Sequence, residues 1–245
     1  MRPILFQWRT FTIWSYPALL YVGLLTGVVA GNVAAHIAGI DAFRVFVAML
    51  VLIALGLTGA RLMYVASNWR FYRQNYRLIW HRNRAGAVQY GALLLALPFS
   101  VFLLHALRLP LGVFWDVGAF TMLIIMMFGR IGCLLNGCCA GRPASGWGTF
   151  YLPNLMGVWD RRVPTQCLES GWCALLLAAA VAIWRYLPFP GALFLLVSAG
   201  YGGGRLVMEF GRELPSGASR LTINHAISLV IVVASLATLL AHWPK

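Results

Sequence analysis

The chain reads LPLGVFWDVGAFTMLIIMMFGRIGCLLNGCCAG from residue 109 to residue 141. Its first part, 109–128, is apolar and long enough to cross a membrane as one helix, which takes about 17 to 25 residues. Arg130 follows this run almost at once. A charge at membrane depth costs roughly 2.5 to 3.5 kcal/mol, and such residues are usually functional. The stretch therefore predicts a transmembrane helix with a functional residue at its end.

Six further runs have a similar length and composition. They cover residues 17–38, 42–66, 87–107, 171–187, 190–208 and 221–241. The chain of 245 residues is 61% hydrophobic and only 10% charged, against about 25% charged in soluble domains. Because the runs lack the alternation of a membrane β-barrel, we expect an all-α integral membrane protein. The predicted fold is a bundle of seven transmembrane helices that forms a single domain over 1–245, with the first helix retained as an anchor.

Two connections between the predicted helices are long. Residues 67–86, SNWRFYRQNYRLIWHRNRAG, interleave aromatic side chains with arginines, as is typical of a helical arm in the headgroup layer. Residues 130–170 are rich in Gly and Pro, which indicates a small irregular cap on the membrane surface. Both connections lie on the side of the N-terminus if seven helices span the bilayer.

The charge of the chain favours anionic partners. The net charge is +13, from 18 arginines and one lysine. Arginine grips phosphate with two parallel donors, so an anionic phospholipid is the expected ligand; a coding bias towards arginine is the alternative. The arginines form no continuous stripe, which argues against nucleic acid. Thirteen basic residues fall on the side of the long connections and four on the other, so the positive-inside rule alone would make the long connections cytoplasmic.

Three segments carry charged side chains into or against the apolar runs. Arg130 could clamp a phosphate or could reach to the interface from a helix end. In YGGGRLVMEFGRE, residues 201–213, the charges Arg205, Glu209 and Arg212 share one helix face. They could hold a phosphate over a pocket floor that includes Tyr201, or they could only neutralise one another.

Other polar residues have simpler explanations as well. Glu169 and Gln166 lie in VPTQCLESGW, residues 163–172, where a carboxylate near a helix start would be favoured by the dipole alone. Asp116 and Arg61 could pair with each other or with backbone groups. The five cysteines contain no CxxC pair, so a structural zinc site is not expected. Cys138 and Cys139 could not both point the same way from a helix, which favours a packing role for the cysteines.

Six segments together resemble the prolipoprotein diacylglyceryl transferase family. They are FTIWSYPALL (11–20), GARLMYV (59–65), GRIGCLLNGCCAG (129–141), VPTQCLES (163–170), YGGGRLVMEFGRE (201–213) and LTINHAISL (221–229). The resemblance covers nearly the whole chain. It implies transfer of the diacylglyceryl group of phosphatidylglycerol to the cysteine thiol of a prolipoprotein signal segment, with release of glycerol phosphate and without a metal or organic cofactor. It also implies the bacterial inner membrane, with the site and the N-terminus on the periplasmic side. We prefer this orientation, because the surplus arginines cluster where an anionic substrate would enter.

The resemblance and the residue patterns together give a predicted site. Its catalytic residues are Arg130, Arg205, Glu209 and Tyr90. Its substrate-binding residues are Tyr16, Arg61, Cys133, Asn136, Cys138, Gly141, Gln166, Glu169 and Tyr201. Membrane lipids are the remaining expected partners.

Three positions depart from the family pattern. QYGALL (89–94) has Tyr90 where the family has the histidine of a His-Gly-Gly motif, so the usual candidate base is missing. Cys133 and Cys138 stand where the family usually has Asn and Glu. These changes leave open another acceptor, the transfer of a phosphoglycerol unit to a glycan or small hydroxyl compound, or a non-catalytic lipid-binding or transport protein.

Overall fold

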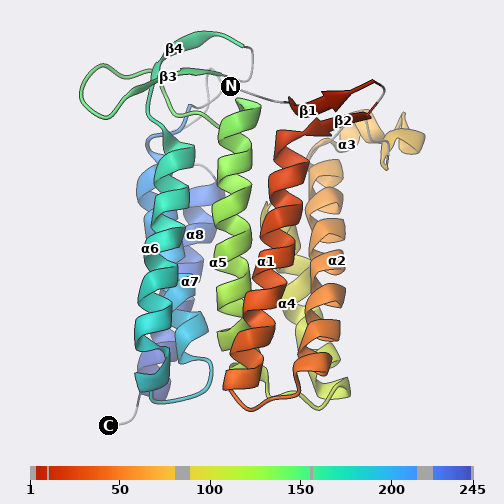
Figure 1. The fold of residues 1–245 in the computed structure, drawn as a ribbon, viewed down its shortest axis with the longest axis vertical. Helices are drawn as coiled ribbons and strands as arrows, with labels where there is room; N and C mark the ends of the chain where they lie inside the picture. The colour runs from red at the N-terminus through yellow and green to blue at the C-terminus, as the bar shows by residue number, and fades with distance from the viewer. Residues whose placement is uncertain (1–3, 10, 81–88, 155–156, 214–222, 244–245) are drawn as a thin grey trace. The chain divides into compact units, whose positions relative to one another are not determined.

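The computed structural model describes residues 4–9, 11–80, 89–154, 157–213 and 223–243 (Figure 1). It has a helix at each of the seven predicted segments. These helices are α1 (Ser15–Ile37), α2 (Ala42–Ser67), α4 (Gln89–Ala106), α5 (Leu111–Asn136), α6 (Thr165–Ile183), α7 (Ala192–Glu209) and α8 (Ile223–His242). Within the described residues, five helices are long and apolar enough to cross a membrane; α4 contributes a shorter apolar helix, and α7 is outside this set. The all-α membrane class is therefore confirmed.

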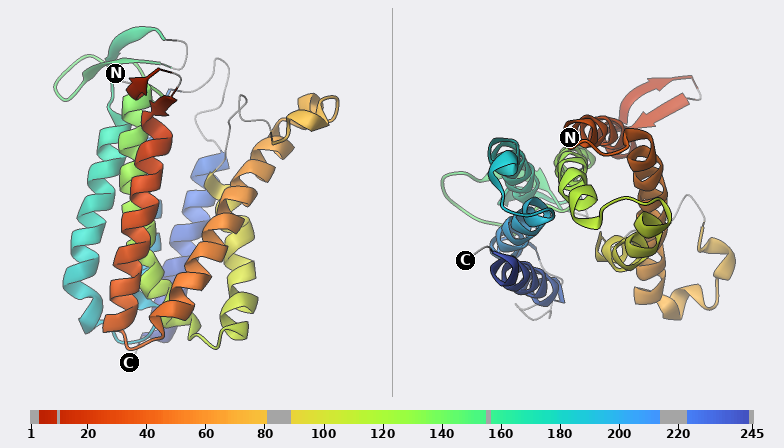
Figure 2. Two further views of the ribbon diagram at one scale, coloured as in Figure 1. Left: turned by 45° about the vertical axis from the view of Figure 1, so that its right-hand side comes forward. Right: turned by 90° about the horizontal axis from the view of Figure 1, so that it is seen from below.

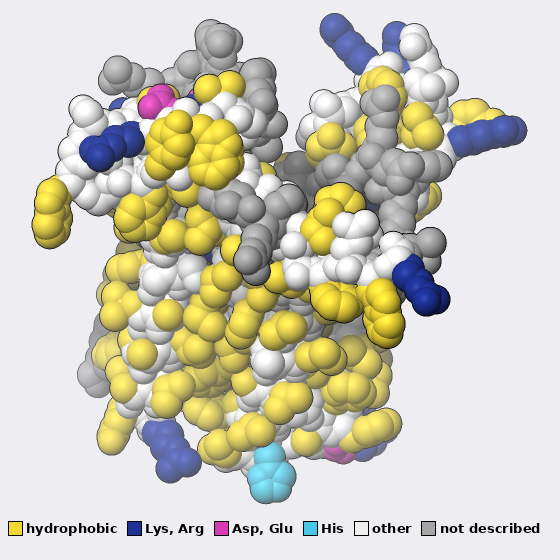
Figure 3. Space-filling view, turned by 45° about the horizontal axis from the view of Figure 1, so that its top comes forward, with side chains coloured by type: hydrophobic (Ala, Val, Ile, Leu, Met, Phe, Trp, Pro, Cys, Tyr) yellow, Lys and Arg dark blue, Asp and Glu magenta, His cyan; other side chains and the backbone are white. Residues whose placement is uncertain are grey.

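The chain divides into two compact units. One comprises Met1–Ala34 and Trp115–Lys245, and the other comprises Ala35–Phe114. In the first unit α7 packs against both α6 and α8 (Figure 2). The helix sides visible in Figure 3 are covered by hydrophobic side chains. Examples more than half exposed are Leu25, Phe43, Leu94, Phe102, Val181 and Leu240. Exposed apolar side chains of this kind suit contact with lipid.

Helices α1 and α5 approach closely within the first unit. The Thr121 hydroxyl on α5 donates a 2.9 Å hydrogen bond to the carbonyl of Gly27 on α1. A Cβ at Gly27 would lie 2.9 Å from the Thr121 carbonyl oxygen, so only glycine permits this contact. Close backbone approach through small residues is a common way for membrane helices to associate.

Asp116 of α5 caps the N-terminus of α7. Its carboxylate accepts hydrogen bonds from the backbone N–H groups of Gly191, at 2.7 Å, and Phe194, at 2.9 Å. These N–H groups lie at the start of α7, where a helix has no preceding carbonyl groups that could accept hydrogen bonds from them. The alternative in which Asp116 pairs with backbone groups is therefore the one found.

The boundaries of the predicted cap need correction. Helix α5 continues beyond residue 128 to Asn136, and α6 begins at Thr165 and not at 171. The segment between Arg130 and Gly137 contains no proline, and the helix ends just before Gly137, whose φ is +74°. Between the helices lies an antiparallel hairpin of β3 (Phe150–Pro153) and β4 (Trp159–Arg162). A second hairpin, β1 (Ile4–Trp8) with β2 (Phe11–Trp14), precedes α1 and was not anticipated from the sequence.

The second unit is built on α2 and α4, which pack against each other. The predicted arm follows α2 and contains α3 (Trp69–Tyr72) and the short 3-10 helix η1 (Tyr76–Leu78). The helical prediction for the arm is thus met for part of its length, and residues 81–88 lie outside the described ranges.

Candidate functional site

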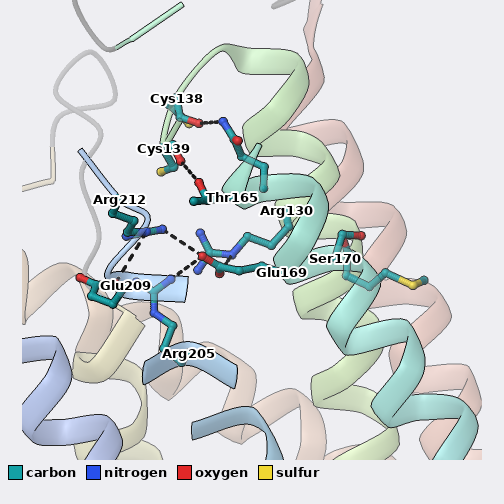
Figure 4. A network of polar contacts seen from close by, with 11 residues as sticks. Arg130, Cys138, Cys139, Thr165, Glu169, Ser170, Arg205, Glu209 and Arg212 are labelled. Atoms are coloured by element: carbon teal, nitrogen blue, oxygen red, sulfur yellow. Dashed lines mark hydrogen bonds and ion pairs between the residues drawn. The ribbon is translucent and has the colours of Figure 1, made fainter. Parts of the chain in front are cut away.

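Glu169 lies at the centre of a cluster of charged side chains in the first unit. Its Oε2 is 2.6 Å from Nε of Arg130, and its Oε1 is 2.5 Å from Nη1 of Arg205. Nη2 of Arg212 lies 3.4 Å from the same Oε1. Three guanidinium groups thus converge on one carboxylate (Figure 4).

The cluster is assembled from three helices and the segment that follows α7. Arg130 lies in the last two turns of α5. Glu169 lies on the buried face of α6, which also includes Thr165, Gln166 and Cys173. Arg205 lies on α7, and Arg212 follows the end of that helix. Segments far apart in the sequence therefore supply the charges that meet here.

Glu209 forms the second acidic point of the cluster. Its Oε2 lies 2.8 Å from Nη2 of Arg205, one helical turn away, and 3.7 Å from Nε of Arg212. Its Oε1 accepts a 2.8 Å hydrogen bond from the side-chain amide of Asn224 on α8. Asn224 thus holds one oxygen of Glu209, and the other oxygen contacts Arg205 and Arg212, so Glu209 can orient both arginines.

The cluster is positively charged and mostly shielded from solvent. Three guanidinium groups and two carboxylates leave a net charge of +1. The side chains of Glu169 and Glu209 are each 3% exposed and that of Arg205 is 7% exposed, whereas Arg212 is 20% exposed. Charge interactions are stronger where water is excluded. This arrangement can bind a singly charged anion and stabilise negative charge that develops on it.

A tight loop after α5 forms one wall of the site. Gly137 and Cys139 have positive φ angles of 74° and 64°. Two donors at the start of α6 hold the loop: Thr165 Oγ1 binds the carbonyl of Cys139 at 2.8 Å, and Gln166 Nε2 binds that of Cys138 at 2.7 Å. Gln166 is therefore occupied in positioning the loop.

Gly141 closes the loop where three segments meet. Its N–H donates to the Val163 carbonyl at 3.0 Å, and the next residue, Arg142, donates to Gly211. A Cβ at this position would lie 2.5 Å from the Val163 oxygen and 2.6 Å from the Gly211 oxygen. The bridge between Gly141 and Arg212 ties this loop to the segment that carries the third arginine.

Gly141→Ala is expected to lower the stability of the folded protein by about 1 to 3 kcal/mol, because neither carbonyl can move away cheaply. Thermal unfolding of the purified protein in detergent measures this effect. Gly203→Ala on α7 is the matched control, since a Cβ there meets no atom within 4 Å. Equal unfolding temperatures for the two variants would contradict the close approach at Gly141.

Three cysteines gather beside the arginines. The sulfur atoms of Cys133, Cys138 and Cys139 all lie within 4.8 Å of one another. The expectation that the adjacent Cys138 and Cys139 diverge applied to a helix, and both residues lie beyond the end of α5. The pKa of the Cys139 thiol is lowered, because the neighbouring Cys133 and Cys138 thiols favour its thiolate form and because Arg212 and Arg130 place positive charge nearby.

Comparison with known proteins identifies the family to which this site belongs. A family model described as prolipoprotein diacylglyceryl transferase matches residues 3–241. The chain belongs to the prolipoprotein diacylglyceryl transferase family.

Curated relatives align along almost the entire chain. A phosphatidylglycerol–prolipoprotein diacylglyceryl transferase of Clostridium tetani is 28% identical over 242 residues, which cover 95% of this chain and 94% of the relative. The protein of the same name from Streptococcus pyogenes serotype M5 is 26% identical over 245 residues, covering 96% and 93%. The family match at residues 3–241 includes the segments that carry the charged cluster.

Several predicted residues of this transferase-family protein lie around the cluster. Tyr16, in the first turn of α1, packs against Gly132 of α5, where a Cβ would lie 3.3 Å from the tyrosine ring. Tyr201 lies one turn before Arg205 on α7. Asn136, the last residue of α5, is exposed, and its side chain lies beside the thiol of Cys138.

Two predicted residues belong to the second unit. Arg61 donates to the Ile79 carbonyl at 2.8 Å and to the Leu78 carbonyl at 3.4 Å, and its guanidinium lies 5.6 Å from the ring centre of Tyr72. These contacts fold the arm back onto α2. Tyr90 lies at the start of α4, and its side chain falls outside the described part of the structure.

Sequence reasoning missed two members of the cluster. The spacing of Arg212 from Arg205 was noticed, but Arg212 was left out of the predicted site. Its contacts depend on a turn at residues 210–211, which no helical periodicity reveals. Asn224 lies in the segment LTINHAISL and had no partner that the sequence could suggest.

Proposed function

We propose that this protein transfers the diacylglyceryl group of phosphatidylglycerol to the cysteine thiol of a prolipoprotein. The single observation that carries this proposal is the convergence of Arg130, Arg205 and Arg212 on Glu169 in a member of this family. The names of the relatives supply the two substrates. A phosphodiester has one negative charge, which matches the net charge of the cluster.

The proposed reaction is a substitution at carbon. The thiol sulfur forms a bond to the glyceryl carbon of the diacylglycerol moiety, and the bond from that carbon to the phosphate oxygen breaks. Glycerol phosphate leaves with both electrons of the broken bond, so negative charge grows on the phosphate. Guanidinium groups that are already in place stabilise this charge without reorganisation.

We assign distinct roles to the charged residues. Arg130 and Arg205 bind the lipid phosphate, and Arg212, the most exposed of the three arginines, meets the headgroup first. Glu169 keeps the guanidinium groups together before the lipid arrives, and Glu209 fixes the orientation of Arg205. Cys133, Cys138, Gly141, Gln166, Tyr16 and Tyr201 shape the surrounding pocket.

The products distinguish this reaction from its alternatives. Purified protein with labelled phosphatidylglycerol and a lipobox peptide is expected to give a diacylglyceryl thioether peptide and free glycerol phosphate. Free diacylglycerol would instead indicate transfer of phosphoglycerol to a hydroxyl acceptor, and no product at all would indicate a lipid-binding protein. Rescue of a bacterial strain depleted of its own transferase provides the corresponding test in cells.

Tyr90 is the predicted acceptor of the thiol proton. Removal of a general base typically costs a factor of about 100 to 10,000 in rate, so Tyr90→Phe is expected to slow transfer by at least roughly 100-fold. The transfer assay above measures the rate, with Tyr76→Phe as the control because Tyr76 is exposed. An unchanged rate for Tyr90→Phe would leave this residue with a packing role only.

We further propose that all seven helices span the bacterial inner membrane as one transmembrane domain, with the charged cluster and the β3–β4 cap on the periplasmic side. The charged side chains of α7 are compatible with a membrane-spanning helix, because Arg205 pairs with Glu169 and Glu209. Paired charges are the usual form in which ionisable residues enter a membrane protein. The basic and aromatic arm at 67–86 would then lie in the outer headgroup layer.

A further inference from the structure

The three cysteines beside the charged cluster form a second, independent arrangement. We propose that the thiols of Cys133, Cys138 and Cys139 bind one thiophilic metal cation of the Cu(I) class. Their sulfur atoms lie within 4.8 Å of one another, and this group contains no histidine and no carboxylate. The proposal does not depend on the transfer reaction.

The end of helix α5 explains why the three sulfur atoms meet. The N–H of Cys138 donates to the Cys133 carbonyl at 3.1 Å, and the Cys138 thiol points to the same carbonyl at 3.6 Å. Cys139 then adopts a φ of +64°, which residues other than glycine rarely adopt. This conformation turns the chain so that the sulfur of Cys139 joins the other two.

The loop that carries two of the cysteines is already fixed. Thr165 and Gln166 bind the carbonyls of Cys139 and Cys138 at 2.8 and 2.7 Å. Because these contacts within the protein hold the loop, cation binding requires little further ordering of the chain. Cys133 is 8% exposed, and the other two cysteines are partly exposed, so a small ion can reach the site.

The donor atoms and the nearby charges favour a soft monovalent cation. Thiolates favour Cu(I), zinc and iron–sulfur clusters, and structural zinc is almost always held by four ligands, so a group of three thiolates favours Cu(I) over zinc. Three thiolates with one Cu(I) have a net charge of −2. Arg130 and Arg212 lie close enough to act on Cys139 electrostatically, and their positive charge offsets that of the thiolates.

The test is an anaerobic titration of the whole purified protein in detergent with Cu(I), in competition with a coloured Cu(I) chelator. One equivalent of Cu(I) is expected to be withheld from the chelator. Cys133→Ser is expected to weaken binding by roughly 100-fold or more, since even the loss of outer partners costs 10-fold to 100-fold. Cys167→Ser is the matched control, because Cys167 lies outside the group, and it should bind as the unmodified protein does.

A second measurement needs no variant. Alkylation followed by peptide mass analysis should show that Cu(I) protects Cys138 and Cys139 while Cys167 reacts as before. If no copper is withheld, or if Cys138 and Cys139 are alkylated equally with and without it, the proposal is wrong. The titration contains neither phosphatidylglycerol nor a peptide acceptor, so its outcome is independent of the proposed transfer activity.

Discussion

Arg205→Ala is expected to reduce the rate of diacylglyceryl transfer by about 1,000-fold. Arg205 joins both carboxylates of the cluster at short distance, through Nη1 to Glu169 and through Nη2 to Glu209, whereas Arg212 lies 3.4 and 3.7 Å from the same two carboxylates. Removal of one preorganised donor typically costs a factor of about 100 to 1,000. Arg205→Ala also leaves two buried carboxylates with fewer positive partners, and the remaining arginines lose their orientation. Arg130→Ala is expected to have an effect of the same order.

Two further variants, Arg205→Lys and Arg161→Ala, separate a loss of activity from a loss of folding. Arg205→Lys keeps the charge but replaces the planar guanidinium fork by one compact ammonium nitrogen, so it should remain folded and still lose most of its activity. Arg161→Ala is the control, because Arg161 is exposed on β4. Normal transfer by both Arg130→Ala and Arg205→Ala, in protein that unfolds at the usual temperature in detergent, would refute the proposed phosphate clamp.

The sequence was sufficient to predict membrane helices and to single out Arg130 and Arg205. Long apolar runs predict membrane helices because the bilayer sets their length, and the cost of Arg130 and Arg205 at membrane depth marks them as unusual. The role of Glu169 could not be decided in this way. Its position near a helix start is equally well explained by the helix dipole, and only the fold shows that three arginines surround it.

The cysteine group shows a different limit of sequence reasoning. A helical interpretation of residues 133–139 separates Cys138 from Cys139, and the positive φ angles of Gly137 and Cys139 reverse that conclusion. A left-handed glycine is often visible in a sequence as a helix end. A left-handed cysteine is not, because nothing in its neighbours requires the conformation. The helical spacing places Arg212 on the face of Arg205 and Glu209, but its contact with Glu169 depends on the turn after α7 and could not be predicted.

Glu169→Gln is expected to lower the stability of the folded protein and to raise its affinity for phosphatidylglycerol. The amide keeps the shape of the carboxylate but loses its charge, so Arg130, Arg205 and Arg212 keep only Glu209 as an acidic partner in the cluster. Breaking a buried ion pair by removal of one partner costs about 3 to 5 kcal/mol, and we expect a loss of stability of that order. The net charge of the cluster rises from +1 to +2, so the same variant should bind phosphatidylglycerol more tightly than the unmodified protein.

Thermal unfolding in detergent, with increasing phosphatidylglycerol, tests both effects of Glu169→Gln together. The variant should unfold at a lower temperature without lipid, and its unfolding temperature should rise more on addition of phosphatidylglycerol, because a ligand that binds the folded state more tightly stabilises it more. Phosphatidylethanolamine, which has no net charge, is the control lipid. The proposed role of Glu169 is wrong if phosphatidylglycerol raises the unfolding temperature of the variant no more than that of the unmodified protein. Glu169 would then take part in lipid binding directly and would not merely hold the arginines until the phosphate arrives.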